Sequence, residues 1–233
     1  MRMEVPRTDA LSAPAGTQLI ETLRVSPQGA LPLLNGHLAR LAHSAQALDW
    51  PCDVAAIRQT LLSTAALLPR GEAAHRMRLL LDAAGELSLE HAELPPLARR
   101  PLLALASEQL DSQEHLLRHK TTHRPWYTRA TTWLAEHPDH FDVLFLNERK
   151  ELCEGSRTNV YLLREGRWLT PPLSSGVLPG VQRAALLARG EAREAVVTLD
   201  DLEQAQGVRL SNALRGWFEV ELRLPERVAA EGG

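Results

Sequence analysis

The run His119-Lys120-Thr121-Thr122-His123-Arg124 lies midway along the chain and decides how the remaining sequence is interpreted. An apolar segment, residues 102–106, precedes it, and Trp126-Tyr127 follows it. Burial lowers the pKa of a lysine, and the neutral amine is the nucleophile that forms Schiff bases. A lone lysine is more often a solvated surface residue, so the other segments must decide between these two interpretations.

The composition is that of a soluble globular protein, with 44% hydrophobic and 24% charged residues among 233. This length allows one large domain or two small ones. The net charge of −3 gives no electrostatic basis for binding nucleic acid or an anionic membrane. Cys52 and Cys153 lie far apart, and neither a signal peptide nor a membrane-spanning run is visible. We therefore expect a cytoplasmic protein with reduced cysteines.

The first half combines alternating and helix-spaced apolar residues, which predicts a compact α+β unit. The expected elements are strands over 18–25 and 30–34, helices over 37–48 and 54–68, and strands over 77–81 and 87–89. The proline-rich stretch 94–101 is the best linker. We therefore place an N-terminal α/β subdomain at residues 1–96 and a C-terminal subdomain carrying Lys120 at residues 97–233.

The second half is richer in strands, which suits an α/β arrangement. We expect strands over 102–106, 142–147, 159–164, 196–199 and 208–210, and helices over 126–136, 181–188 and 200–203.

Small residues over 174–180 stand immediately before the helix expected at 181–188. Free backbone N–H groups and the positive end of the helix dipole form an anion site there, for which phosphate is the natural ligand. An ordinary Gly/Pro turn remains the more frequent explanation for such a run considered alone.

Two charged residues stand among apolar neighbours. Glu154 would need a cationic partner if buried, and a protonated pyridine nitrogen would supply one. The alternative, a rim carboxylate paired with an arginine, suits Glu151 better than Glu154. Arg40 lies between the apolar positions of its helix, so it is either solvated or turned inward to hold an anion.

His115, His119 and His123 are four residues apart, a spacing that could align them on a helix. The run lacks the glutamate of a zinc-protease helix and has poor helix formers at its centre. No metal site is therefore expected. Cys153 lacks any sign of a thiolate-stabilising environment or an oxyanion hole, so a nucleophilic role for it has little support.

Six segments in this order resemble the class IV aminotransferases, the fold type IV pyridoxal-phosphate enzymes. Together they extend over most of the chain. They are residues 21–25 (ETLRV), 36–41 (GHLARL), 119–122 (HKTT), 154–159 (EGSRTN), 170–180 (TPPLSSGVLPG) and 211–216 (SNALRG).

This resemblance implies a two-subdomain fold like that of D-amino-acid aminotransferase, a homodimer, and pyridoxal 5'-phosphate as cofactor. It implies that Lys120 binds the cofactor covalently and then acts as the acid and base. Glu154 would pair with the pyridine nitrogen, and Leu178 would pack against the ring. Phosphate binding would fall to Arg40 and to the backbone near Val181, Gln182, Asn212 and Ala213, and Asn159 completes the expected cofactor-binding set.

Within the family the closest likeness is to 4-amino-4-deoxychorismate lyases, which act in folate biosynthesis. Thr22 matches a threonine that those lyases place near the cofactor, and we expect it to be catalytic. Pro125 stands where branched-chain transaminases have a tyrosine, so Tyr127 has no certain counterpart. The family's Asp-x-Gly loop before the first strand is also missing from the short leader, which leaves the substrate open.

The resemblance therefore implies release of 4-aminobenzoate and pyruvate from aminodeoxychorismate. An aminotransferase acting on branched-chain or D-amino acids is the alternative, and a non-catalytic cofactor-binding or interaction protein is an alternative of another class. Arg78, Arg124 and Arg215 are the candidates for binding the substrate carboxylate.

Overall fold

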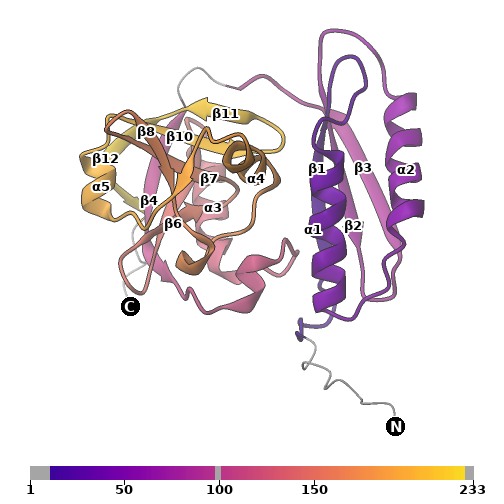
Figure 1. The fold of residues 1–233 in the computed structure, drawn as a ribbon, viewed down its shortest axis with the longest axis horizontal. Coiled ribbons are helices and arrows are strands. Elements are labelled where there is room, and N and C mark those ends of the chain that lie inside the picture. Colours follow the sequence, from indigo (N-terminus) through magenta and orange to yellow (C-terminus); the bar gives the residue numbers. More distant parts are fainter. Residues whose placement is uncertain (1–10, 98–100, 229–233) are drawn as a thin grey trace.

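A computed structural model describes residues 11–97 and 101–228 as two units that lie side by side. Figure 1 shows a smaller unit, built on a three-stranded sheet and two helices, beside a larger unit built on a nine-stranded sheet. This arrangement confirms the expected mixed α/β fold class. The division after residue 96 stays a prediction, and residues 98–100 lie outside the described part of the chain.

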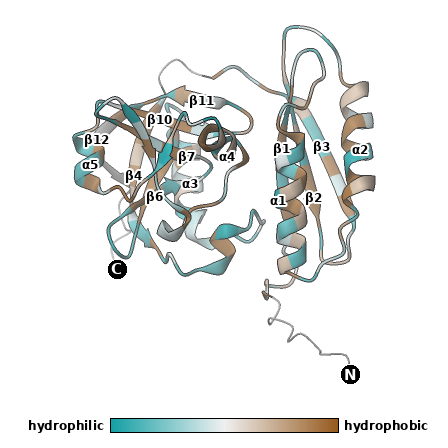
Figure 2. Ribbon diagram, in the orientation of Figure 1, coloured by the Kyte–Doolittle hydropathy of each residue, from teal (hydrophilic) through white to brown (hydrophobic). Residues whose placement is uncertain are grey.

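The smaller unit packs two helices on an antiparallel sheet of order β1-β2-β3. Its elements are β1 (Leu19–Val25), α1 (Leu34–Ala47), α2 (Val54–Leu67), β2 (His75–Leu81) and β3 (Leu87–Glu93). Alternate residues of β1 and β2, such as Leu23 and Met77, pack with Leu41 of α1 and Leu61 of α2. Figure 2 shows hydrophobic residues along these elements.

The strand predicted over residues 30–34 is wrong. The turn after β1 closes as the Gly29 N–H donates to the Ser26 carbonyl, and the chain then enters α1 at Leu34. Pro32 has no N–H to donate to a strand ladder. The neighbour of β1 is instead β2, with Thr22 opposite Arg78.

The larger unit contains a mixed sheet of order β11-β10-β7-β6-β5-β4-β12, with β8 and β9 extending from β7. Its strands are β4 (Leu102–Leu110), β5 (His140–Asn147), β6 (Leu152–Gly155), β7 (Asn159–Arg164), β8 (Arg167–Thr170), β9 (Arg193–Glu194), β10 (Gly207–Asn212), β11 (Gly216–Glu219) and β12 (Glu221–Val228). Its helices are α3 (Thr128–Glu136), α4 (Val181–Ala188) and α5 (Leu199–Glu203), with 3₁₀ turns at His115–Arg118, Pro125–Tyr127 and Leu173–Ser175.

The strand predicted over residues 196–199 is also wrong, because this segment leads into the N-terminus of helix α5, which begins at Leu199. Thr198 is the N-cap of α5, and its side chain accepts from the Asp201 N–H in a capping box. The short strand β9 lies before it, at Arg193–Glu194.

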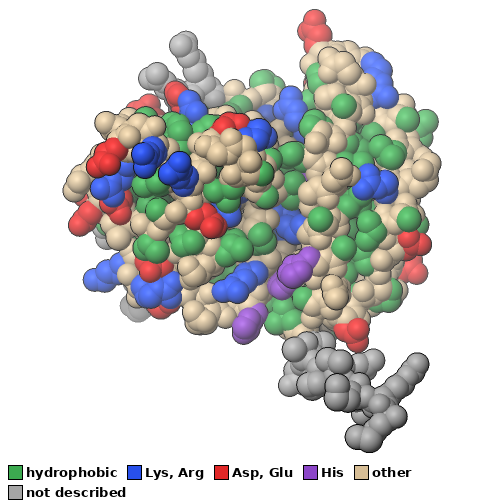
Figure 3. Space-filling view, viewed as in Figure 1, with side chains coloured by type: hydrophobic (Ala, Val, Ile, Leu, Met, Phe, Trp, Pro, Cys, Tyr) green, Lys and Arg blue, Asp and Glu red, His purple; other side chains and the backbone are tan. Residues whose placement is uncertain are grey.

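The two units meet along β1, which positions the lysine segment. The Ile20 N–H donates to the Lys120 carbonyl at 2.7 Å, and the Thr122 N–H donates to the Gln18 carbonyl at 2.8 Å. Helix α1 closely approaches α4, since a Cβ on Gly36 would lie 2.5 Å from Val181 Cγ1. On the face shown in Figure 3, basic side chains and histidines lie along this boundary. In the described ranges, no helix is long and apolar enough to cross a membrane.

Candidate active site

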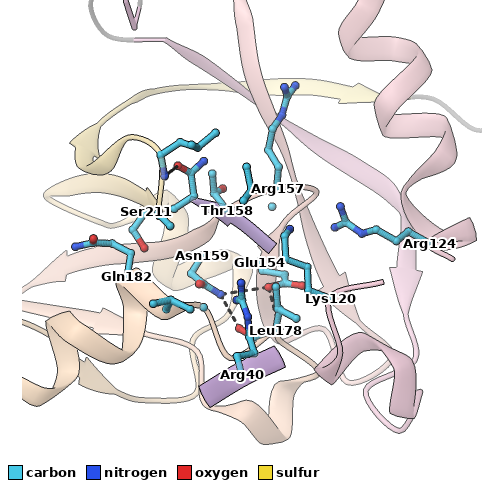
Figure 4. A pocket seen from close by; sticks show the side chains of 17 residues that line it. Arg40, Lys120, Arg124, Glu154, Arg157, Thr158, Asn159, Leu178, Gln182 and Ser211 are labelled. Carbon is cyan, nitrogen blue, oxygen red and sulfur yellow. Dashed lines mark hydrogen bonds between the residues drawn. The ribbon is translucent and has the colours of Figure 1, made fainter. Parts of the chain in front are cut away.

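A cavity of about 160 Å³ lies between the two units, where the segments singled out from the sequence converge (Figure 4). All ten residues expected at a catalytic and cofactor site line it: Thr22, Arg40, Lys120, Glu154, Asn159, Leu178, Val181, Gln182, Asn212 and Ala213.

Lys120 enters the cavity from the segment whose backbone is bonded to β1. Removal from water lowers the pKa of Lys120 to about 7, and the nearby charges of Arg124 and Arg40 add to this effect. A substantial fraction of the amine is therefore neutral near pH 7. That is the form required of a nucleophile or a general base.

Glu154 is buried on β6 and accepts hydrogen bonds from three neutral donors. The Tyr127 hydroxyl donates at 2.7 Å, the Leu178 N–H at 2.9 Å and the Asn159 amide at 3.2 Å. Burial raises the pKa of Glu154 to about 7. Among the described residues, no Lys, Arg or His nitrogen pairs with this carboxylate within 4.0 Å. A protonated pyridine nitrogen would provide the cation that this carboxylate lacks.

A tight turn after β6 sets Glu154 opposite Asn159 in the sheet register. The buried carboxylate of Asp142 holds this turn by accepting from the hydroxyls of Ser156 and Thr158, each at 2.6 Å. A Cβ on Gly155 would lie 2.2 Å from Asp142 Oδ2, so glycine is required for this close approach. The turn therefore fixes the two side chains at the base of the cavity.

The opposite end of the cavity is built to hold an anion. Helix α4 begins there after Gly180, and no side chain caps its N-terminus, so the N–H groups of Val181 and Gln182 remain available. The turn after β10 lies beside it, shaped by Asn212 Oδ1, which accepts from the N–H groups of Leu214 and Arg215. A phosphate fits this combination of helix start and backbone turn.

Arg40 also faces this end and is fixed by Glu21, a residue that the sequence did not single out as part of the site. Its Nε and Nη2 donate to the two Glu21 carboxylate oxygens at 2.8 and 2.6 Å, and its Nη1 donates to the Pro179 carbonyl at 3.2 Å. A guanidinium has five N–H donors, so two remain for an anion. His37 Nδ1 lies 2.6 Å from the other side of Glu21.

The three arginines proposed for a substrate carboxylate lie in different places. Arg124 lines the cavity with Lys120, stacks 4.5 Å over the Tyr127 ring and donates to the Ser156 carbonyl at 2.5 Å. Arg78 pairs with Glu90 in the small sheet and does not line the cavity. Arg215 lines a second cavity. Further lining residues lie in the segments quoted from the sequence but had no individual role assigned there: Gly155, Arg157, Thr158, Gly180, Ser211 and Leu214.

The three histidines of the lysine segment do not form a helical stripe. Residues 115–118 are a 3₁₀ turn, and the backbone of His119 is extended. The His119 ring contacts the Ser44 hydroxyl and stacks on His43 instead. Among the described residues, no group of His, Cys, Asp and Glu could hold a metal ion.

Comparisons with known proteins agree with this geometry. The family described as amino-transferase class IV matches residues 18–222. A provisionally named amino-acid aminotransferase from Mesorhizobium loti is 39% identical, with a TM-score of 0.81 over 89% of this chain and 100% of that one. A provisionally named aminodeoxychorismate lyase of Schizosaccharomyces pombe is 29% identical over 195 residues, 80% of this chain and 82% of the yeast protein.

The structure of 4-amino-4-deoxychorismate lyase from Pseudomonas aeruginosa is 26% identical to this chain, with a TM-score of 0.69. The match covers 91% of this chain and 88% of that protein. Members of this family use pyridoxal phosphate. The N–H donors at one end of the cavity suit its phosphate, and the Glu154 carboxylate is an acceptor that suits its protonated pyridine nitrogen. The chain belongs to the class IV aminotransferase family of pyridoxal-phosphate-dependent enzymes.

Proposed function

We propose that this protein is a lyase that converts 4-amino-4-deoxychorismate to 4-aminobenzoate and pyruvate, a reaction of folate biosynthesis. The observation that carries the proposal is the position of Thr22, which lines the cavity from β1 together with Lys120. A hydroxyl at this position can supply a proton without a second substrate. Similarity to proteins named as lyases supports the same assignment.

The active-site residues have two kinds of role: some would hold the cofactor and the substrate, and others would transfer protons. Arg40, the start of α4 and the turn at Asn212 would hold the phosphate of pyridoxal phosphate, and Glu154 would pair with its pyridine nitrogen. Bound there, the cofactor supplies an electron-withdrawing ring that stabilises negative charge on the substrate carbon. Arg124 would hold a substrate carboxylate beside Lys120.

Proton transfer then falls to Lys120 and Thr22. The neutral Lys120 amine removes the proton from the substrate carbon that bears nitrogen. The enolpyruvyl C–O bond breaks as the substrate ring becomes aromatic, which drives the step. Enolpyruvate takes up one proton, relayed by the Thr22 hydroxyl, and becomes pyruvate. One substrate thus gives two products with no change in the number of protons.

An aminotransferase acting on branched-chain or D-amino acids is the second candidate, because the same cavity residues serve both reactions. The two activities differ in their need for an acceptor. An aminotransferase requires a 2-oxo acid as amino acceptor to complete a turnover. The lyase requires only its substrate.

The test is to incubate the cofactor-loaded protein with aminodeoxychorismate alone and, separately, with L- and D-amino acids plus 2-oxoglutarate. We expect equal amounts of 4-aminobenzoate and pyruvate from the first mixture, with Lys120→Ala as the inactive control. Production of 2-oxo acids from the amino acids, with no 4-aminobenzoate from aminodeoxychorismate, would replace the lyase by an aminotransferase. A protein that binds pyridoxal phosphate but does neither would be the non-catalytic alternative.

We also propose that the protein is a homodimer located in the cytoplasm. Exposed hydrophobic side chains, Leu62 and Leu67 on α2 and Val196 near β9, leave apolar surface that a second copy could cover. Cys52 and Cys153 are both free thiols, which suits a reducing compartment. Light scattering at micromolar concentration should give twice the chain mass, and the mass of one chain would contradict the dimer.

A further inference from the structure

A second cavity of about 460 Å³ lies next to the active site, at the end proposed for the phosphate. It shares Gln182 and Ala213 with the active-site cavity but none of the residues proposed for proton transfer. We call it the arginine cavity. Its lining consists of Leu23, Arg24, Leu31, Pro32, Leu33, Leu34, His37, Gln182, Arg189, Ala213, Arg215 and Gly216.

Two partly buried guanidinium groups face this cavity without a carboxylate partner among the described residues. Arg24 Nη1 donates to the Leu214 carbonyl at 2.9 Å, and Arg215 Nη1 donates to the Pro95 carbonyl. Both side chains line the same cavity, where their like charges repel each other. Burial and the charge of Arg24 accordingly lower the pKa of Arg215. No Asp or Glu lines the arginine cavity. An anion would relieve this repulsion.

Arg189, the third arginine that lines the cavity, differs from Arg24 and Arg215 because it has a carboxylate partner. Arg189 is exposed and already pairs with Glu191. Arg40, the arginine of the active-site cavity, is bound to Glu21 and does not line the arginine cavity. Arg24 and Arg215 therefore form a separate cationic pair with donors still available.

Most of the remaining wall of the arginine cavity is apolar. Leu23 of β1, Leu34 of α1 and Leu31 of the connection between them line it. His37 also lines it, and its Nδ1 is held by Glu21 while its Nε2 has no partner among the described residues. Such a wall suits the body of an organic molecule and gives inorganic phosphate nothing to bind.

From the two guanidinium groups and the apolar wall beside them we infer that the arginine cavity binds a small organic carboxylate. The forked guanidinium groups of Arg24 and Arg215 match a carboxylate, and the leucine wall accepts an aromatic or branched body. The inference does not depend on which reaction the active site performs. Because Gln182 and Ala213 belong to both cavities, such a ligand would also brace the backbone proposed to hold the cofactor phosphate.

Benzoate is the probe, titrated calorimetrically into the cofactor-loaded protein so that the phosphate end of the active site is filled. We expect a binding event that Arg24→Gln or Arg215→Gln weakens about tenfold or more, because a charged hydrogen bond is lost in each variant. Arg78→Gln, in the small sheet and outside both cavities, is the matched control and should bind as the parent does.

Arg124→Gln distinguishes the two cavities. Benzoate binding that survives in Arg24→Gln and Arg215→Gln but is lost in Arg124→Gln would assign the ligand to the active site and overturn the inference. Inorganic phosphate binding in place of benzoate, at equal ionic strength, would overturn the assignment to an organic carboxylate. If Arg24→Gln fails to fold because its bond to Leu214 is lost, Arg215→Gln alone decides the outcome.

Discussion

Glu21→Gln should destabilise the protein strongly, although Glu21 touches no substrate in our account. Its carboxylate is buried at 2% exposure and holds Arg40 through both oxygens, with His37 beside it. Burial alone would raise the pKa of Glu21, but the charge and hydrogen bonds of Arg40, with those of His37, lower it to about 2. The ionised form is therefore stabilised by folding.

The magnitude follows from this pKa. The difference between the usual value of 4.5 and about 2 corresponds to about 3 kcal/mol, at roughly 1.4 kcal/mol for each pH unit. A depressed pKa contributes stability above pH 4.5, and that stability is lost as the pH falls from 4.5 toward 2. Glutamine is uncharged, like protonated glutamate, so the variant lacks this contribution at pH 7. A loss of this size lowers the Tm of a chain this long by about 6 to 12 °C.

Calorimetric or circular-dichroism melting at pH 7 measures the change, and Glu90→Gln is the control. Glu90 also pairs with an arginine of the small sheet, Arg78 at 3.5 Å, but its side chain is 56% exposed, so its removal should change the Tm little. The difference between the parent and Glu21→Gln should also shrink below pH 4.5. Equal Tm values at pH 7, or a difference that grows in acid, would refute the buried ion pair.

Three further predictions concern the active-site side chains. Since the pKa of Lys120 is about 7, uptake of pyridoxal phosphate by the apoprotein should accelerate as the pH rises through 7 and then level off, which stopped-flow absorbance can follow. Glu154→Gln should retain the cofactor but turn over roughly 100-fold more slowly or worse, because an amide carries no charge to hold the pyridine proton; unchanged turnover would make Glu154 structural. Thr22→Val should slow 4-aminobenzoate release without altering the spectrum of the bound cofactor, whereas parental release would leave Thr22 only a strand residue.

The sequence predicted the cavity's components well because each belongs to a local motif. Lys120, Glu154 and the start of α4 each stand in a short segment whose chemistry is visible without knowledge of its neighbours. Folding brings these segments together through contacts of β1 and α1, which the sequence alone did not indicate. Helix periodicity likewise predicted α1, α2 and α4 to within a few residues of their ends.

The features that the sequence missed depend on contacts between distant segments. Glu21 alternates with Thr22 on β1, so the strand pattern points it away from the cavity and gives no sign that it anchors Arg40 from behind. Tyr127 reaches Glu154 only because the chain makes a 3₁₀ turn at Pro125–Tyr127. Arg24 and Arg215 line one cavity because the turn after β10 contacts the smaller unit, where Arg24 donates to the Leu214 carbonyl.

The most direct test of the central assignment is to find which amine carries the cofactor. The chain has two lysines, Lys120 in the cavity and the exposed Lys150, so borohydride reduction of the cofactor-loaded protein followed by peptide mass spectrometry gives a clear answer. Our account predicts the reduced cofactor on the peptide containing Lys120, with Lys150→Arg unchanged. An adduct on Lys150, or none on Lys120 after loading, would contradict it.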